Sequence, residues 1–265
     1  MAPLSIAIQS FGMRALQARS LAQGVSHTHM PTRKDKVTAQ AAHLLDVYRA
    51  LKARFALLEP LLVDQDLITR LRTGRRRHGL HILRSALVES CILGMVKIVH
   101  DGDARSPSVS GLITALDDDV LRAELREDYA VWNVAPDDID DPDLRALVLS
   151  SEKRDKAARR TQFDGLVVKL HDRAKHFDAT TPIEAVRRMQ DQLIAHNQIS
   201  FNGTNYQPLD VARLELKLSD IGAIIGALES IMDAITLIFR NSSFDFTHLQ
   251  EQLIADRNGF WASSP

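Results

Sequence analysis

The stretch LELKLSDIGAIIGALESIMDAITLIF, residues 214–239, decides the fold of this chain. Its apolar residues recur at spacings of four and three, and this seam consists of Leu214, Leu218, Ile221, Ile225, Leu228, Met232, Ile235 and Phe239. Such spacing places one continuous apolar seam along a helix, as in coiled coils. Four further residues widen the apolar face, namely Leu216, Ile224, Ile231 and Ile238. We therefore predict a helix at the centre of a bundle, with a dimer interface as the alternative.

Helical spacing continues over most of the remaining chain. Apolar residues three or four positions apart predict helices over 37–59, 64–99, 108–132 (capped by Ser108 or Ser110) and 142–177. Another helix is expected to start at Pro182, with Thr181 as its cap, and to end before the Asn202-Gly203 breaker. No stretch shows the alternation of apolar and polar residues that marks a strand. The prediction is an all-α bundle of about six to seven helices.

The first residues of the chain differ in composition from the rest. Residues 1–34 contain no Asp or Glu but carry Arg14, Arg19, Arg33 and Lys34, which is the composition of a transit peptide. The alternative is a flexible extension ahead of Met30, where a charged segment begins. We expect a disordered extension over residues 1–36 and a single domain over residues 37–262.

Overall composition excludes several classes of protein. Hydrophobic residues make up 45% and charged residues 25%, and the net charge of −1 gives no global attraction to nucleic acid or membrane. Cys91 is the only cysteine, so the chain has no disulfide framework, and a reducing, cytoplasmic location is expected. Glu229 and Asp233 interrupt the most apolar segment, so no membrane span is predicted.

The acidic residues and histidines of the chain do not have the spacing of known metal sites. Asp117, Asp118 and Asp119 lack the spacing of a calcium loop and are interpreted as helix caps or solvated loop residues. His171 and His176 lie five residues apart, whereas a helical metal pair has a spacing of four. We predict neither a metal ion nor another cofactor.

The segment QDQLIAHN, residues 190–197, carries a resemblance to a known family. Together with the helix that follows it, up to Trp261, the segment resembles the HEPN superfamily and its abortive-infection Abi-U branch, best over residues 181–261. The resemblance implies a helical homodimer that cleaves RNA without a metal ion. By position it implies that His196 is the general acid or base, with Asp191 and Asn197 as polar neighbours. Gln190 stands where the family has an arginine.

Because Gln190 replaces the family arginine, another residue must supply the positive charge that binds the phosphate. Glutamine donates a hydrogen bond but brings no positive charge to the transition state. Arg188 is the first substitute, but in a continuous helix it would lie about 12 Å along the axis and roughly 80° around it from His196, which is a marginal geometry. Arg187 would face the opposite side, and an arginine of the partner subunit is the alternative. If the resemblance is set aside, the alternative interpretation of His196 is a histidine that caps the C-terminal end of a helix.

A second cationic region lies near the start of the predicted 64–99 helix. No acidic residue occurs between Asp66 and Glu89, while six arginines and two histidines fall in this interval. We select Arg75, Arg76 and Arg77 as candidate RNA-binding residues, because clustered cations bind phosphates. The alternative is a solvated helix start that pairs with the acidic connector at 136–142, and aromatic residues for base stacking are scarce nearby.

Three functions are consistent with these observations. The first is a metal-independent endoribonuclease of a phage-defence or toxin–antitoxin system, with RNA as substrate and an antitoxin or other protein as partner. The second is a HEPN-like module that has lost cleavage and serves as an adaptor for RNA, nucleotide or protein. The third is a helical oligomerisation protein without nucleotide chemistry.

Overall fold

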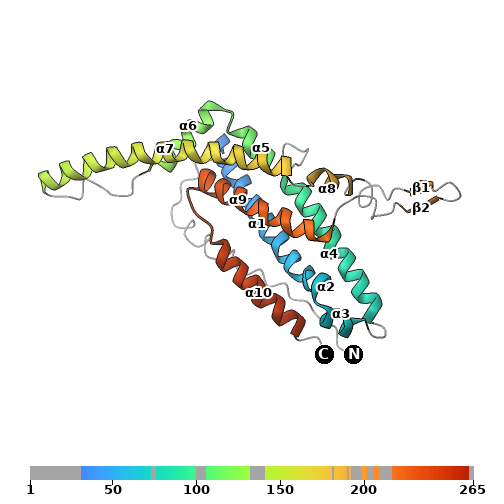
Figure 1. Cartoon of the computed structure of the whole chain (residues 1–265). Helices are drawn as coiled ribbons and strands as arrows, with labels where there is room; N and C mark the ends of the chain where they lie inside the picture. Colours follow the sequence, from blue (N-terminus) through green and yellow to red (C-terminus); the bar gives the residue numbers. More distant parts are fainter. Residues whose placement is uncertain are drawn as a thin grey trace, which may run out of the picture. The chain divides into compact units, whose positions relative to one another are not determined.

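The computed structural model describes residues 31–72, 76–99, 106–131, 141–180, 182–189, 191, 199–201, 206–208 and 217–262. Every described helix and strand belongs to the unit Arg33–Pro265 (Figure 1). In chain order these are α1 (Arg33–Leu58), α2 (Pro60–Val63), α3 (Gln65–Leu71), α4 (Arg76–Val99), α5 (Val109–Ala115), α6 (Asp119–Tyr129), α7 (Pro142–Thr180), α8 (Ile183–Met189), β1 (Ile199–Phe201), β2 (Tyr206–Pro208), α9 (Leu218–Arg240) and α10 (Phe246–Ala262). The all-α prediction is confirmed.

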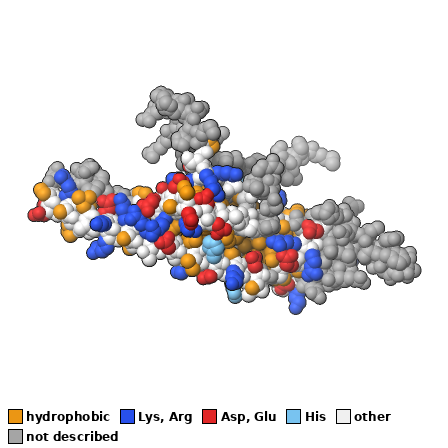
Figure 2. All heavy atoms as spheres, turned by 90° about the horizontal axis from the view of Figure 1, so that it is seen from above, with side chains coloured by type: hydrophobic (Ala, Val, Ile, Leu, Met, Phe, Trp, Pro, Cys, Tyr) orange, Lys and Arg blue, Asp and Glu red, His pale blue; other side chains and the backbone are white. Residues whose placement is uncertain are grey.

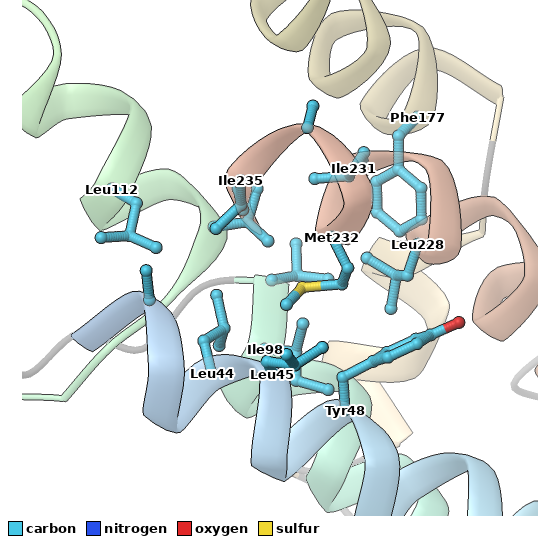
Figure 3. Packing of buried hydrophobic residues seen from close by; sticks show 14 of the residues in the cluster. Leu44, Leu45, Tyr48, Ile98, Leu112, Phe177, Leu228, Ile231, Met232 and Ile235 are labelled. Atoms are coloured by element: carbon cyan, nitrogen blue, oxygen red, sulfur yellow. The ribbon is translucent and has the colours of Figure 1, made fainter. Parts of the chain in front are cut away.

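The predicted seam from Leu218 to Phe239 forms α9, which contacts α1, α4, α6 and α7. Leu214 and Leu216, with which the prediction began, lie outside the described residues. Its apolar residues are buried on several sides, and the buried set includes Ile221, Ile224, Ile225, Leu228, Ile231, Met232, Ile235, Ile238 and Phe239. Figure 3 shows α9 side chains meeting Leu44, Leu45 and Tyr48 of α1, with Ile98 of α4 beside them. The sequence pattern therefore predicted the helix around which the bundle is built.

Both ends of α9 have local chemical causes. At its start, the Asp220 carboxylate accepts a hydrogen bond from the Lys217 backbone N–H at 2.8 Å, which satisfies one of the free donors of a helix N-terminus. At its end, Asn241 adopts a left-handed conformation with φ 48°, which asparagine tolerates better than most residues. These two residues fix the length of the central helix.

α1 and α9 approach each other closely at a glycine. A Cβ atom placed on Gly222 would lie 2.8 Å from Cζ of Phe55, closer than real contacts allow. The hydrogen side chain of Gly222 therefore lets the Phe55 ring lie against the α9 backbone. This contact sets the distance between the two helices.

Glu229 interrupts the apolar sequence of α9 because it joins a polar cluster with α1. The Tyr48 hydroxyl donates to the Ile225 carbonyl at 3.0 Å, and its oxygen lies 3.4 Å from Glu229 Oε2. Lys52 Nζ lies 2.5 Å from the same Glu229 oxygen, and only 10% of the Lys52 side chain is exposed. Burial, and then the charge of Glu229, raise the pKa of Tyr48 far above its ordinary value. Glu229, one of the two charges that interrupt the apolar run, is thus paired with a largely buried lysine of α1.

One described helix segment, Ser219–Arg240, is long and apolar enough to cross a membrane by length and composition alone. The same segment is the core helix of the bundle, with Ile221, Leu228 and Ile235 completely buried against neighbouring helices. A buried core helix passes the same test, so the segment gives no firm evidence for a membrane protein.

Several predicted helix boundaries are wrong. The expected 64–99 helix is divided into α3 and α4, and the expected 108–132 helix is divided into α5 and α6. Ser108 caps α5 as predicted, since its hydroxyl accepts from the Gly111 N–H at 3.2 Å. The second division falls where Asp118 caps α6 by accepting from the Val120 and Leu121 N–H groups at 2.9 and 3.1 Å. The described part of the chain contains ten helices, more than the six to seven predicted.

The largest correction concerns the helix that was expected to run to the Asn202-Gly203 breaker. α8 ends at Met189, and Ile199–Phe201 is a strand that pairs antiparallel with Tyr206–Pro208. The register places Ser200 opposite Gln207. The predicted helix start near Pro182 is confirmed, but α8 is shorter than predicted, and Ile199–Phe201 is a strand where the last turn of the helix was expected.

Candidate functional site

α8 leads into the segment that carries the family resemblance. Its first turn is closed by the Pro182 carbonyl, which accepts from the Ala185 and Val186 N–H groups at 3.0 and 3.1 Å. Ile183, Ala185 and Val186 are buried, and α8 packs against α4. This apolar face anchors the short helix and directs the two arginines of its last turn elsewhere.

Arg187 and Arg188 have different environments. Arg187 is half-buried, and its Nη1 lies 2.5 Å from Oε1 of Glu184 one turn earlier. Arg188 is exposed and makes no ion pair within the described part of the chain. Arg187, which the helical projection had ranked below Arg188, is therefore the arginine that the fold holds against neighbouring elements.

The predicted catalytic residues are only partly described. Asp191 is exposed, whereas Gln190, His196 and Asn197 lie outside the described residues. The rotation between Arg188 and His196 was based on a helix that continued to about residue 201, and the strand at Ile199–Phe201 contradicts that helix. The roles of His196, Arg188, Asp191, Asn197 and Gln190 therefore stay predictions.

A pocket of about 370 Å³ lies beside α8, and we call it the α8 pocket. Residues of α4, α5, α7, α8 and α9 line it. Its apolar lining consists of Val99, Val109, Ile113, Ala174, Phe177, Leu228 and Ile231. Most of these side chains also belong to the hydrophobic core, so the floor of the pocket is the surface of the bundle core. Such a floor is rigid and suits an apolar group.

Polar side chains from three helices surround this floor. They are Ser110 and Thr114 of α5, His171, Lys175 and Asp178 of α7, and Arg187 of α8. His171 Nδ1 lies 2.9 Å from the Val167 carbonyl, so its N–H donates to the helix backbone. Its Nε2 lies 3.9 Å from Asp117 Oδ1, which is too long for a hydrogen bond. Nε2 therefore retains its capacity to bind another group.

Lys175 stands out among the cations of α7. Cations in the outer part of this helix gather on one face of the molecule, at the left of Figure 2, and many are paired. Arg160 lies 2.5 Å from Glu127, Lys156 lies 2.6 Å from Glu152, and Arg126 of α6 binds Asp164 at 2.9 Å. Lys175 is exposed and makes no ion pair or hydrogen bond among the described residues. Two of these three ion pairs join α6 to α7 and the third lies within α7, whereas Lys175 lines the pocket.

The second predicted cationic region lies far from this pocket. Arg77 is exposed in the first turn of α4, and Val99 at the other end of the same helix lines the pocket. Their separation of 22 residues corresponds to about 33 Å of helix. Arg75 lies outside the described residues, and the side chain of Arg76 is not described. The fold does not bring Arg77 together with Arg187 and Lys175.

The acidic cluster and the cysteine have structural explanations. Asp118 caps α6 and pairs with Arg33, and backbone N–H groups, chiefly that of Leu121, lower the pKa of its carboxyl. Asp119 pairs with Arg122. Among the described residues no three His, Cys, Asp or Glu side chains are grouped as metal ligands require. Burial raises the pKa of the Cys91 thiol to about 12, so it is not a ready nucleophile.

Sequence reasoning overlooked the pocket although a signal for it was present. His171, Ala174, Lys175 and Asp178 have the spacing of one helical face, at positions i, i+3, i+4 and i+7. His171 had been assessed only for metal spacing against His176. The contribution of Arg187 had no sequence signal, because it depends on how α8 packs against α4.

Of the comparisons with known proteins, a family model matches most of the chain. The model of the HEPN_AbiU2 family, described as AbiU2, matches residues 34–260 of the 265-residue chain. No curated protein and no solved structure matches the chain. The family match extends well beyond residues 181–261, on which the resemblance was based, and confirms it. The chain therefore belongs to the AbiU2 family of HEPN proteins.

Proposed function

We propose that this abortive-infection-type HEPN protein binds RNA and cleaves it without a metal ion. The observation that supports the proposal most strongly is the family match over residues 34–260. His196 lies within this range, and the resemblance of residues 190–197 to the family motif implies that it is the acid/base histidine. Histidine suits this role because its charge changes near neutral pH. The substrate class is single-stranded or looped RNA, since its 2′-hydroxyl must reach the neighbouring phosphorus.

The proposed reaction uses the 2′-hydroxyl of RNA as its own nucleophile. A base removes the 2′-hydroxyl proton, the 2′-oxygen bonds to phosphorus, and the P–O5′ bond breaks. An acid gives a proton to the departing 5′-oxygen, so the products are a 2′,3′-cyclic phosphate and a 5′-hydroxyl. His196 acts as acid or base, and a cation stabilises the charge that develops on the phosphate. Arg188, or an arginine of a partner subunit, is the proposed cation.

The second candidate function is an adaptor that binds without cleaving. Gln190 favours this candidate, because a neutral amide replaces the arginine that stabilises phosphate charge in the family pattern. The remaining features of the site are equally suited to binding RNA, nucleotide or protein. Cleavage activity separates the two candidates directly.

The proposal also covers the oligomeric state of the protein and its location in the cell. We propose a cytoplasmic homodimer, since the family resemblance implies paired motifs and the single cysteine suits a reducing compartment. We also propose that an antitoxin or other partner protein restrains the activity. Arg75, Arg76 and Arg77 remain proposed RNA contacts.

The test is cleavage of a labelled single-stranded RNA in the presence of EDTA. Wild-type protein is expected to produce fragments that end in a cyclic phosphate, and His196→Ala is expected to lower the rate at least 100-fold. His248→Ala is the matched control, because His248 is an exposed histidine on α10 whose ring contacts only Gln252 among the described groups. Cleavage that survives His196→Ala contradicts the acid/base role. RNA binding without cleavage supports the adaptor.

A further inference from the structure

We propose that the α8 pocket binds one nucleotide of the RNA, with the base on its apolar floor and the phosphate beside Lys175 and Arg187. This assignment rests on the proposed RNA function and names the part of the substrate that the pocket holds. A pocket of about 370 Å³ with an apolar floor and a few polar groups at its edge has the character of a small-ligand site.

The floor favours a flat, largely apolar group. Val109, Phe177, Leu228 and Ile231 are each at most 5% exposed and are held in the core. An unstacked base that lies on this floor moves its own apolar face out of water, and the binding requires little rearrangement of the protein. A base that leaves its stack has such a face, whereas an inorganic anion has none.

The edge of the pocket favours a single phosphate. Lys175 brings a positive charge that no described acidic group neutralises, and Arg187 keeps N–H groups beyond the one that Glu184 engages. His171 Nε2 at the same edge is an acceptor, because the ring proton lies on Nδ1, and it suits a sugar hydroxyl or a base N–H group. Asp178 lies among these cations, so a second phosphate group would meet a carboxylate. The charge pattern thus suits one phosphodiester or monophosphate, while Asp178 accepts hydrogen bonds from the sugar or base.

The position of the pocket in the chain connects it to the proposed chemistry. Arg187 belongs to the pocket and stands three residues before Gln190, the first residue of the family segment. A cation held by the fold beside this segment fits a nucleotide adjacent to the one that is cleaved. The pocket therefore acts in binding and positioning and has no part in proton transfer.

The test uses full-length protein and nucleoside monophosphates, with binding measured by calorimetry. Adenosine or uridine monophosphate is expected to bind more tightly than either the free nucleoside or inorganic phosphate. Lys175→Gln is expected to weaken monophosphate binding about tenfold, because it removes a charge-assisted contact. Ala174→Leu is expected to weaken it as strongly without any change of charge, because the larger side chain fills the pocket.

Matched controls exist on the same helix. Lys169→Gln removes the same charge from an exposed α7 lysine that does not line the pocket, and Ala158→Leu enlarges an exposed alanine outside it. Neither control is expected to change binding by more than twofold. Equal effects of the test and control variants, or monophosphate that binds no better than phosphate, overturn the assignment.

The result is independent of the cleavage assay. Monophosphate binding that depends on Lys175 and Ala174 supports the pocket even if His196→Ala still cleaves RNA, in which case only the catalytic assignment fails. Cleavage that requires His196, combined with monophosphate binding that is insensitive to both pocket variants, overturns the pocket and leaves the proposed reaction intact.

Discussion

Lys52 on the α1 side of α9 and Lys175 on its α7 side have opposite environments. On the α1 side, Tyr48, Lys52 and Glu229 contact one another, and the Tyr48 hydroxyl also binds a backbone carbonyl. On the α7 side, Lys175 lines the α8 pocket without an ion pair to any described residue. Partnered groups hold helices together, whereas a cation beside an apolar floor is available to a ligand. The difference predicts that stability and binding can be changed separately.

The largest expected effect comes from the core itself. Met232 is completely buried and does not line the α8 pocket. Met232→Ala is expected to lower the free energy of unfolding by about 3 kcal/mol through lost burial and a cavity. Urea denaturation measures the loss, and Met232→Leu is the control that conserves volume. Monophosphate affinity of the folded variant should stay unchanged, and a tenfold loss of affinity would show that core and pocket are not separable.

The polar cluster should give a smaller loss. Lys52→Met removes the cation that contacts Glu229 while it keeps most of the buried aliphatic stem. The expected cost is about 1–2 kcal/mol, reduced from that of a fully buried pair because 38% of the Glu229 side chain is exposed. Adding Glu229→Gln to Lys52→Met should recover part of this cost, since no unpaired charge remains. Additive losses in the double variant would contradict a direct interaction.

The buried thiol predicts a loss of stability at alkaline pH. Burial raises the pKa of Cys91 from the ordinary 9.0 to about 12, so above pH 9 the unfolded thiol ionises while the folded thiol keeps its proton. Stability contributed by the protonated thiol is therefore complete below pH 9 and declines as the pH rises towards 12. At pH 10 the expected decline is about 1.4 kcal/mol. The Cys91→Ala variant should not show this decline. The measurement is the free energy of unfolding as a function of pH, and equal declines in wild type and variant would contradict the prediction.

The core was more predictable from sequence than the site, for a physical reason. The seam from Ile221 to Phe239 follows a local period of 3.6 residues, which is visible without knowledge of any contact. The caps at Ser108 and Asp118 are equally local, although apolar spacing on both sides of Asp118 concealed the division between α5 and α6. Local patterns thus specified which residues are buried.

The α8 pocket depends on contacts between elements that sequence spacing does not encode. Lys175 and Arg187 are separated by the boundary between α7 and α8, and only the fold of α8 against α4 places both at one pocket. The same limit applies to α8 itself, where the Asn202-Gly203 breaker was read as a helix end although the preceding residues form a strand. The family resemblance identified residues 190–197, which follow Arg187 in the sequence, but it did not identify the residues that line the α8 pocket.

The smallest effect on stability, with the largest effect on binding, is expected for Lys175→Gln. Lys175 is exposed and supports no described contact, so its replacement should change the free energy of unfolding by less than about 0.5 kcal/mol. The same change removes the unpaired positive charge of the pocket and should weaken monophosphate binding about tenfold. Raising the salt concentration should narrow this difference between wild type and variant, because screening weakens an exposed charge contact. A Lys175→Gln variant that loses stability as Lys52→Met does would place Lys175 among the structural cations, and the contrast between the two sides of α9 would not hold.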